Sequence, residues 1–358
     1  MRTDEHLTTV ERTAQLCARP VRATFIGGMV VLCMTIVLSI SVGPTGFTLS
    51  SLPRAIAETR AANWSPETFV TLQIRMPRML LGAFVGAALA LSGAMMQGLF
   101  RNPIADPGLI GVSSGAALAA VATIALGNTV AAPVMRGFGV YALPVAAFAG
   151  GLVATLTLVA PCRRSGVVMI GTLLLAGIAI AALCGALTGF IAFGSDDREL
   201  RDLTLWSLGS IAGASWPKVA AVTPFAMLLG LMAPRLTRAL NGLLLGEAEA
   251  FHLGVDVESA KRLCIVLTAA ATGAAVAVAG ILGFVGIVVP HVVRLIAGPD
   301  HRIVLPAAAI FGAILVLLAD IIARMAVRPA ELPLGLVLAA VGAPIFLHLV
   351  VRRTAGEG

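Results

Sequence analysis

The amino-acid sequence predicts an all-α integral membrane protein with about ten transmembrane helices. Hydrophobic residues make up 58% of the 358 residues and charged residues only 12%, and the mean hydropathy is +0.97. A soluble domain of this size could not cover so much apolar side chain with so few polar groups. Since one span needs about 20 mainly apolar residues, the apolar runs indicate about ten spans in one domain at 24–353.

The two ends of the chain are expected to be short tails. Residues 1–23 carry four arginines among acidic and polar side chains. They are expected to form a cytoplasmic tail, followed by an uncleaved first span at about 24–42. A cleaved signal peptide would have a shorter charged head and a cleavage site of small residues. Residues 354–358 are expected to form a C-terminal tail beyond the last span.

Polar turns separate the remaining spans. Segments 43–73 and 195–217 carry enough charge to lie outside the membrane, and each is expected to contain a short helix. The most polar internal stretch of the second half runs from about 236 to 262. The expected spans after the first are 78–100, 108–126, one that ends at the turn 161–166, 167–193, 218–232, two within 263–296 that are broken by glycines and Pro290, 305–325, and a tenth that ends before Arg352.

The basic residues predict the orientation of the chain. In this arrangement, 15 of the 25 Lys and Arg residues lie on the same side as the two tails. An excess of positive charge marks the cytoplasmic side, so both termini are expected there. The formal net charge of +7 is therefore interpreted as a topology signal rather than a nucleic-acid footprint, and no nucleic acid is expected as a partner.

Two similar glycine-bounded runs suggest an internal repeat. The run GAALALSG at Gly86–Gly93 lies in the second span, and GAAVAVAG at Gly273–Gly280 lies in the seventh. Five spans separate equivalent positions, so the second copy runs in the opposite direction. This pattern predicts an inverted-topology repeat that relates spans 2–5 to spans 7–10. Small-residue faces for helix packing would give similar runs, and the two interpretations are compatible.

The sequence lacks the motifs of the common catalytic sites. It contains no Gly-Lys pair and therefore no P-loop for ATP. It also contains no H-E-x-x-H or G-x-S-x-G motif, and its five cysteines include no C-x-x-C pair. Its His, Cys, Asp and Glu residues form no cluster with metal-ligand spacing. The chain is therefore expected not to be an enzyme, and no metal or cofactor is expected.

One acidic residue, Asp320, falls well inside an expected span. Such a group costs about 2.5 to 3.5 kcal/mol to insert unless it is paired. Asp320 could couple transport to protons or sodium. A structural acid paired with Arg324, one helical turn away, is the favoured alternative.

A short polar segment, GEAEAFHLG, is bounded by Gly246 and Gly254. Its spacing predicts a short amphipathic helix with apolar contacts at Phe251 and Leu253. The segment is either a solvated loop or a docking element for a cytoplasmic partner.

Four long runs resemble one known family. They start at Ile74 (IRMPRMLLGAFVGAALALSGAMMQGLFRNPIADPGLIGVSSGAALA), Leu243 (LLLGEAEAFHLGV), Gly283 (GFVGIVVPHVVRLIAGPDHR) and Leu318 (LADIIARMAVRPAELPLGLVLAAVGAPIFLHLV). In this order they resemble the permease subunits of FecCD-type ABC importers for iron siderophores, haem and cobalamin, most closely the haem branch. The resemblance covers residues 74–353.

The resemblance implies a type II ABC importer permease of the bacterial inner membrane, surrounded by membrane lipid. Two copies would form a homodimer with the path along its axis. Two separate cytoplasmic ATPase subunits would bind on one side, and a periplasmic substrate-binding protein would dock on the other. The missing P-loop agrees with a transport subunit whose ATP is hydrolysed by its partners.

The resemblance also assigns roles to particular residues. Arg75, Arg78 and Arg324 match positions that receive acidic residues of the binding protein. The segment GEAEAFHLG lies within a coupling loop at about 236–262 and matches the element that sits in a groove of the ATPase. Its coupling residues would be Gly246, Glu247, Glu249, Phe251, His252, Leu253 and Gly254.

The cargo is expected to be haem or a related iron chelate. Segment 195–216 resembles the haem branch, and Arg198 or Arg201 at the mouth of the path could attract the haem propionates. Alternatively, both arginines pair with acids of the same segment. Import of a ferric siderophore or cobalamin remains an alternative. An ion-coupled secondary transporter is a further one, and it would transport without an ATPase.

Overall fold

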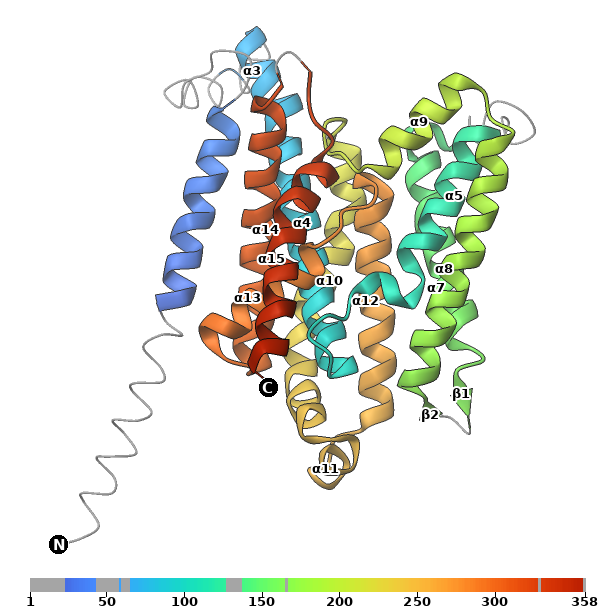
Figure 1. Ribbon diagram of the computed structural model, residues 1–358. Helices are drawn as coiled ribbons and strands as arrows, with labels where there is room; N and C mark the ends of the chain where they lie inside the picture. The colour runs from blue at the N-terminus through green and yellow to red at the C-terminus, as the bar shows by residue number, and fades with distance from the viewer. Residues whose placement is uncertain are drawn as a thin grey trace, which may run out of the picture.

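The computed structural model describes residues 23–42, 58, 65–126, 137–164, 167–327 and 330–356, which form a helical bundle (Figure 1). The first helix spans Ala23–Ser41. The later elements are α3 (Pro66–Val70), the π-helical turn η2 (Thr71–Arg75), α4 (Met76–Phe100), the 3-10 turn η3 (Pro107–Ile110), α5 (Val112–Leu126), η4 (Gly139–Tyr141), α7 (Ala142–Val159), α8 (Ile170–Phe193), α9 (Asp197–Ser207), α10 (Trp216–Leu245), α11 (Glu247–His252), α12 (Val257–Ala279), α13 (Val285–Ala297), α14 (His301–Met325) and α15 (Leu334–Gly356). The expected N-terminal tail, the final residues 357–358 and most of segment 43–64 lie outside the described residues.

The predicted all-α membrane fold with about ten spans is confirmed. Seven helices of the described chain are long and apolar enough to cross a membrane, and α5, α13 and Leu334–His348 of α15 are shorter apolar helices. Together they occupy the ten expected positions in order. Among the described residues, strand occurs in one short hairpin, in which β1 (Arg163–Arg164) pairs antiparallel with β2 (Val167–Val168).

The internal polar stretch is more helical than expected. The sixth span was expected to end at 232 and a loop to run from 236 to 262, but α10 continues to Leu245. Only Gly246 and residues 253–256 separate α10, α11 and α12. The reason is that Leu236, Ala239, Leu240 and Leu243 share one buried face of the extension. Residues at this spacing form an amphipathic helix even where charged side chains cover the other face.

The packing follows the predicted inverted repeat. Helix α4 packs on α14 and α13, whereas its counterpart α12 packs on α7 and α5. The pairs α5–α8 and α7–α8 in the first half correspond to α13–α15 and α14–α15 in the second. In Figure 1, α4 descends from α3, whereas α12 rises from α11. The two halves therefore have the same packing pattern with opposite directions.

The two glycine-bounded runs have different structural roles. A Cβ atom added at Gly86 would lie 2.3 Å from the carbonyl oxygen of Gly312, and one at Gly93 would lie 1.9 Å from that of Gly286. These glycines therefore allow close backbone contact of α4 with α14 and α13, as expected for helix association in lipid. In the second run, Gly280 instead ends α12 with a φ of +71°, a conformation that favours glycine.

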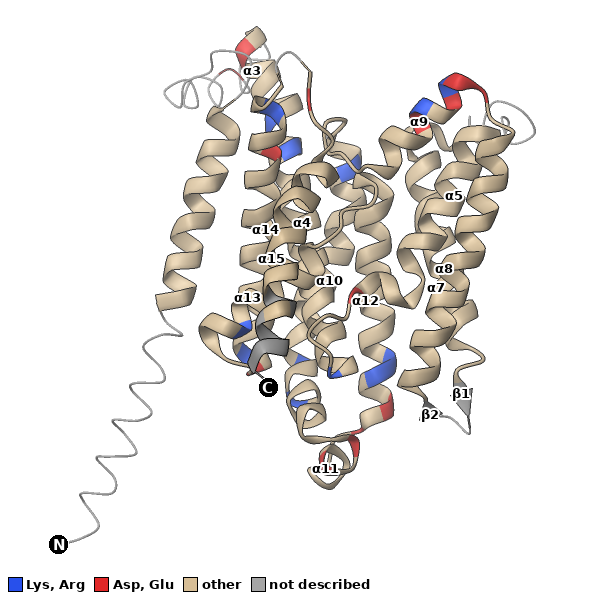
Figure 2. Ribbon diagram, viewed as in Figure 1, with Lys and Arg blue, Asp and Glu red and all other residues tan. Residues whose placement is uncertain are grey.

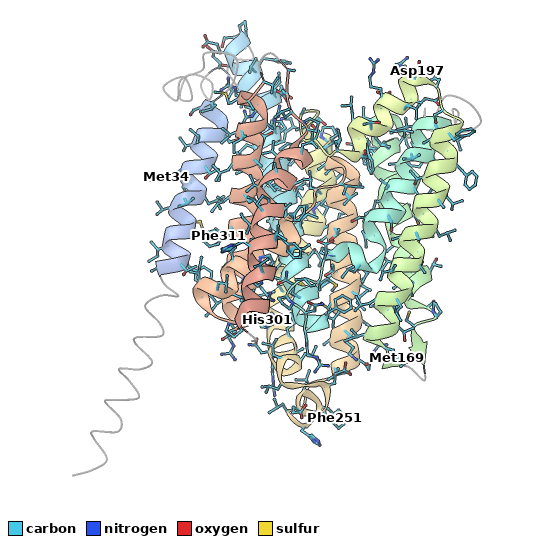
Figure 3. The ribbon with its side chains drawn as sticks, in the orientation of Figure 1. Met34, Met169, Asp197, Phe251, His301 and Phe311 are labelled. Carbon is cyan, nitrogen blue, oxygen red and sulfur yellow. The ribbon has the colours of Figure 1, made fainter. Side chains whose placement is uncertain are left out.

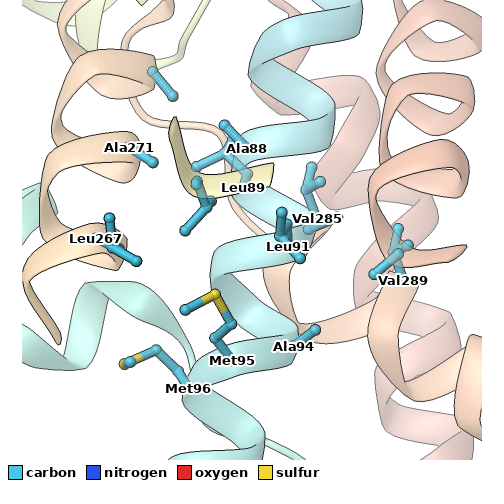
Figure 4. Packing of buried hydrophobic residues seen from close by; sticks show 14 of the residues in the cluster. Ala88, Leu89, Leu91, Ala94, Met95, Met96, Leu267, Ala271, Val285 and Val289 are labelled. Atoms are coloured by element: carbon cyan, nitrogen blue, oxygen red, sulfur yellow. The ribbon is translucent and has the colours of Figure 1, made fainter. Parts of the chain in front are cut away.

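Helix α4 lies at the centre of the hydrophobic core. Figure 4 shows Leu91 and Met95 of α4 between side chains of α12 and α13 such as Leu267 and Val289. All these side chains are buried. Because α4 packs on α10, α12, α13 and α14, a shift of this helix would disturb most of the bundle.

Charged residues gather at the two ends of the bundle and leave its middle largely apolar (Figure 2). One end carries α3 and α9, and the other carries α11. We refer to them as the α3–α9 end and the α11 end. This distribution places the charges outside the hydrocarbon core of a bilayer, where their burial is costly.

Candidate functional site

At the α3–α9 end, arginines from two distant helices meet around two carboxylates. Arg78 of α4 donates from Nε and Nη2 to Asp320 Oδ1 of α14, at 3.0 and 2.8 Å. It also donates from Nη1 and Nη2 to both carboxylate oxygens of Glu331, at 3.1 and 2.9 Å. Arg324 Nε lies 3.0 Å from Asp320 Oδ2, an ion pair rather than a well-aligned hydrogen bond. We call Arg75, Arg78, Arg324, Asp320 and Glu331 the arginine cluster.

The other arginine contacts hold the end of the first helix. Arg324 donates to the carbonyl oxygens of Ser39, at 3.2 Å, and Val42, at 2.9 Å. Arg75 donates to those of Ile40 and Ser41. The last carbonyls of a helix lack partners within the helix and carry partial negative charge, so guanidinium groups stabilise them. The cluster therefore fixes the first helix to η2 and α14.

The three arginines predicted for docking thus lie together, but they are buried in the isolated chain. Arg75, Arg78 and Arg324 are 5%, 7% and 6% exposed. The structural alternative for Asp320, a pair with Arg324, is confirmed. The pairing of Asp320 with Arg78, its second partner, was not predicted, because no local spacing links residues so far apart in the chain. Among the cluster's carboxylates, Glu331 is the accessible one, with a side-chain exposure of 36% against 1% for Asp320.

At the opposite end, α11 forms the predicted short helix between two glycines. Gly246 has a φ of +135° and Gly254 one of +75°, so both turns require a conformation that other residues rarely adopt. Ala250 is buried against α10 near Gly242. Phe251 is 71% exposed and Leu253 53%, and Figure 3 shows Phe251 at the tip of α11, pointing away from the bundle. A short helix that holds an exposed apolar side chain is suited to a partner groove.

Glu247, one of the expected coupling residues, holds α11 to α12. Its carboxylate lies 2.7 Å from Lys261 Nζ, and that of Glu258 lies 3.0 Å from the same atom. Lys261 is 1% exposed at its side chain. Glu249 and His252 are exposed, and Arg238 of α10 donates to the carbonyl oxygen of Leu253 at 3.1 Å. The geometry of α11 is therefore set by contacts to both neighbouring helices.

A second set of polar contacts fixes the start of α14. Asp300 caps this helix by accepting from the Arg302 N–H at 2.9 Å, and it accepts from Asn241 Nδ2 of α10 at 2.7 Å. Burial raises the pKa of Asp300, but these hydrogen bonds and the charge of Arg302 outweigh it, so the pKa lies below its ordinary value. His301, which is labelled in Figure 3, bonds to Asn241 Oδ1. The role of Asn241 was not predicted from the sequence.

Arg198 and Arg201, predicted at the mouth of the path, lie on α9 at the α3–α9 end. Both are exposed. Within the described ranges, neither forms an ion pair with the neighbouring acids, so pairing with acids of the segment is not the explanation for them. Asp196 and Glu199 instead form a capping box at the start of α9. Among all the residues that the structure describes, no group of three His, Cys, Asp or Glu side chains could hold a metal ion.

Comparisons with known proteins agree with this arrangement. Residues 31–352 match the FecCD transport family. The haemin transport system permease of Yersinia pestis is 46% identical over 284 residues, which are 79% of this chain and 84% of the relative. The cobalamin import system permease of Halobacterium salinarum is 44% identical over 290 residues, which are 80% and 75% of the two chains.

A solved structure shares the fold. It is described as an inward-facing conformation of a metal-chelate type ABC transporter, with a TM-score of 0.80, 31% identity and coverage of 92% of this chain and 99% of that chain. The relatives are permease subunits, whose ATPase is a separate partner, so this chain is a multi-pass transport subunit and not an enzyme. The chain belongs to the FecCD transport family of ABC importer permeases.

Proposed function

We propose that this chain is the permease of an importer that moves haem, or a related iron chelate, from the periplasm to the cytoplasm. The observation that carries the proposal is that two elements suited to docking lie at opposite ends of one packed bundle. The arginine cluster lies at the α3–α9 end and the exposed α11 at the other. In this proposal the α11 end and both termini face the cytoplasm. The 46% identity to a haemin permease favours haem as cargo.

Docking of the binding protein would proceed by exchange of carboxylates. Arg78 already bonds to both oxygens of Glu331, and the accessible Glu331 lies in the segment between α14 and α15. An acidic side chain of a docked protein could take its place on Arg78, while the buried Asp320 keeps the guanidinium in position. Exposed ion pairs contribute little affinity but help orientation and association rate. Release of Glu331 would then free the segment that leads into α15.

The opposite partner would be an ATPase subunit that receives α11 in a groove. Phe251 and Leu253 supply the exposed apolar contacts, and Glu249 and His252 supply polar ones. Glu247 acts inside the permease, because it holds α11 through Lys261 to α12. A displacement of α11 would therefore be passed to α12, which packs on α4, α7 and α10.

A second copy of the chain would complete the path. Helix α8 exposes large apolar side chains along its length, among them Leu175 at 71%, Ile178 at 61% and Phe190 at 77%. Exposed apolar faces are normal where lipid covers them, but a homodimer along α8 and α15 would also cover them. The small and apolar residues of such a path would suit a bulky ligand that is passed without tight binding.

The cargo is tested by a direct comparison of ligands. Haem, a ferric siderophore and cobalamin are titrated against the cognate binding protein, and uptake is measured in proteoliposomes that contain the permease, the ATPase and that protein. Haem uptake that requires ATP is the expected result. Uptake of cobalamin alone would assign the chain to the alternative cargo, to which a 44% identical relative points. Uptake without an ATPase, driven by an ion gradient, would favour a secondary transporter.

A further inference from the structure

A groove on the outside of the bundle lies between α10 and α14 and reaches Leu91 of α4. Its volume is about 400 Å³. The lining residues are Leu91, Gly230, Ala233, Pro234, Thr237, Arg302, Leu305, Pro306, Ala309 and Ile310. We call it the α10–α14 groove. It shares no residue with the arginine cluster or with α11, and the proposed function does not use it.

The groove has a polar end and an apolar end. Helices α10 and α14 run in opposite directions, so Thr237 and Arg302 lie near the α11 end and Gly230 and Ile310 lie deeper in the bundle. At 1.5 Å per residue, the groove extends about 10 Å along the helices. The first helix packs against α14 at the deep end, since a Cβ added at Gly28 would lie 3.3 Å from Ile310.

Two prolines add polar backbone to this surface. Pro234 and Pro306 lie inside α10 and α14. Each lacks the N–H that would bond to the carbonyl oxygen one turn earlier. Those carbonyls belong to Gly230 and Arg302, which also line the groove. Membrane helices tolerate such freed backbone groups where another group satisfies them.

The guanidinium of Arg302 supplies the charge. The residue is exposed, and within the described chain its side chain forms no ion pair or hydrogen bond. Asp300, two positions earlier in the chain, already accepts from the Arg302 N–H and from Asn241. A basic side chain at the mouth of an apolar groove between membrane helices matches the phosphate and acyl chain of a phospholipid.

We propose that the α10–α14 groove binds one anionic phospholipid from the leaflet at the α11 end. Its phosphate lies at Arg302, and one acyl chain lies along Ala233, Leu305 and Ala309. The bound lipid would pack α10 against α14 next to the contacts of Asn241 that hold the start of α14. The lipid is therefore a structural ligand of the permease, independent of the cargo.

The test uses the full-length protein in detergent, stripped of lipid and titrated with phosphatidylglycerol or phosphatidylcholine under native mass spectrometry. One tightly held phosphatidylglycerol per chain is expected. Loss of one basic contact near the membrane surface predicts about fivefold weaker binding for Arg302→Gln. Arg262→Gln, at an exposed arginine of α12, is the matched control and is expected to bind as the wild type does.

A second pair of variants tests the acyl chain. Ala309→Trp would fill the groove and is expected to abolish tight binding, whereas Leu231→Trp, on an exposed position beside the groove, is expected to leave it unchanged. Equal binding of both lipids, or an equal effect of the two tryptophans, would overturn the proposal. The soluble headgroup glycerophosphoglycerol lacks an acyl chain, so displacement of phosphatidylglycerol by this headgroup alone would also overturn the proposal. Cross-linking of Ile310→Cys to a second copy would show that a protein covers the groove instead.

Discussion

The buried ammonium of Lys261 allows the tie between α11 and α12 to be tested from both sides. Lys261 is 1% exposed, whereas Glu247 and Glu258 are 40% and 25% exposed at their side chains. Lys261→Met removes the buried charge and leaves two carboxylates that water can reach. The double variant Glu247→Gln and Glu258→Gln removes the two carboxylates that pair with the buried ammonium. The two changes break the same contacts but leave different groups behind.

The expected magnitudes differ for this reason. Removing the partners of a buried charge costs about 3–5 kcal/mol, so the double glutamine variant should be strongly destabilised. Replacement of a buried charge by an apolar side chain of similar size is often neutral when its partners can reach water, so Lys261→Met should change global stability by about 1 kcal/mol or less. Its main effect should be local, because α11 loses its hold on α12 while the rest of the bundle is intact.

The assay has two readouts. Thermal unfolding in detergent should give a much lower Tm for the double glutamine variant than for Lys261→Met. In proteoliposomes with the ATPase and the binding protein, Lys261→Met should bind the ATPase but lose most of the transport that accompanies ATP hydrolysis. Equal Tm values for the two variants would refute the argument from burial. Undiminished transport by Lys261→Met would refute the role of the ion pair in coupling.

Three further predictions concern the proposed docking sites and the proposed mouth of the path. Glu331→Gln should tighten binding of the substrate-binding protein, measured at low salt, because the competing carboxylate on Arg78 is lost. Phe251→Asp should reduce ATPase binding in a pull-down assay by at least tenfold, because it removes a 71% exposed apolar contact. Arg198→Ala together with Arg201→Ala should slow haem uptake several-fold with no change in Tm, since both side chains are exposed and lack ion pairs with described residues.

Matched controls separate these effects from general damage. Glu331→Gln is preferable to charge reversal at Arg78, which would leave the buried Asp320 facing a new acid and would destabilise the bundle. Weaker or unchanged docking of Glu331→Gln would contradict the exchange of carboxylates. Thr204→Ala, at an exposed residue on the same helix as Arg198 and Arg201, should change neither docking nor haem uptake. Uptake that is unaffected by loss of Arg198 and Arg201 would remove these arginines from the path.

Several features of this protein follow from sequence patterns alone. Composition excluded a soluble fold, and the apolar runs placed all ten helices in order, because burial in lipid requires long stretches without charge. The two glycine-bounded runs predicted the inverted repeat. The short helix between Gly246 and Gly254 was also predictable, since two glycines and an amphipathic segment are local signals. The resemblance of four long runs to one family brought together Arg75, Arg78 and Arg324 as a site.

The helix ends were less predictable. The charges at Arg235 and Arg238 suggested that the sixth span had ended. The length of an apolar stretch and the length of the helix that contains it are, however, separate properties. A helix continues wherever its buried face finds partners, and here the extension of α10 packs its apolar face against the rest of the bundle. The charged residues of the extension only show that it has left the hydrocarbon core.

Tertiary structure alone decided how the charged groups are paired. The sequence linked Asp320 to Arg324 through their spacing on one helix, but it could not link Asp320 to Arg78, which lies 242 positions away. Nor could it link Glu247 to Lys261, which the fold brings together across α11 and α12. The pattern of apolar residues along the sequence shows which residues are removed from water, and the class of fold follows from that pattern. The partner of a buried charge depends on which helices meet, and only the packed bundle determines that.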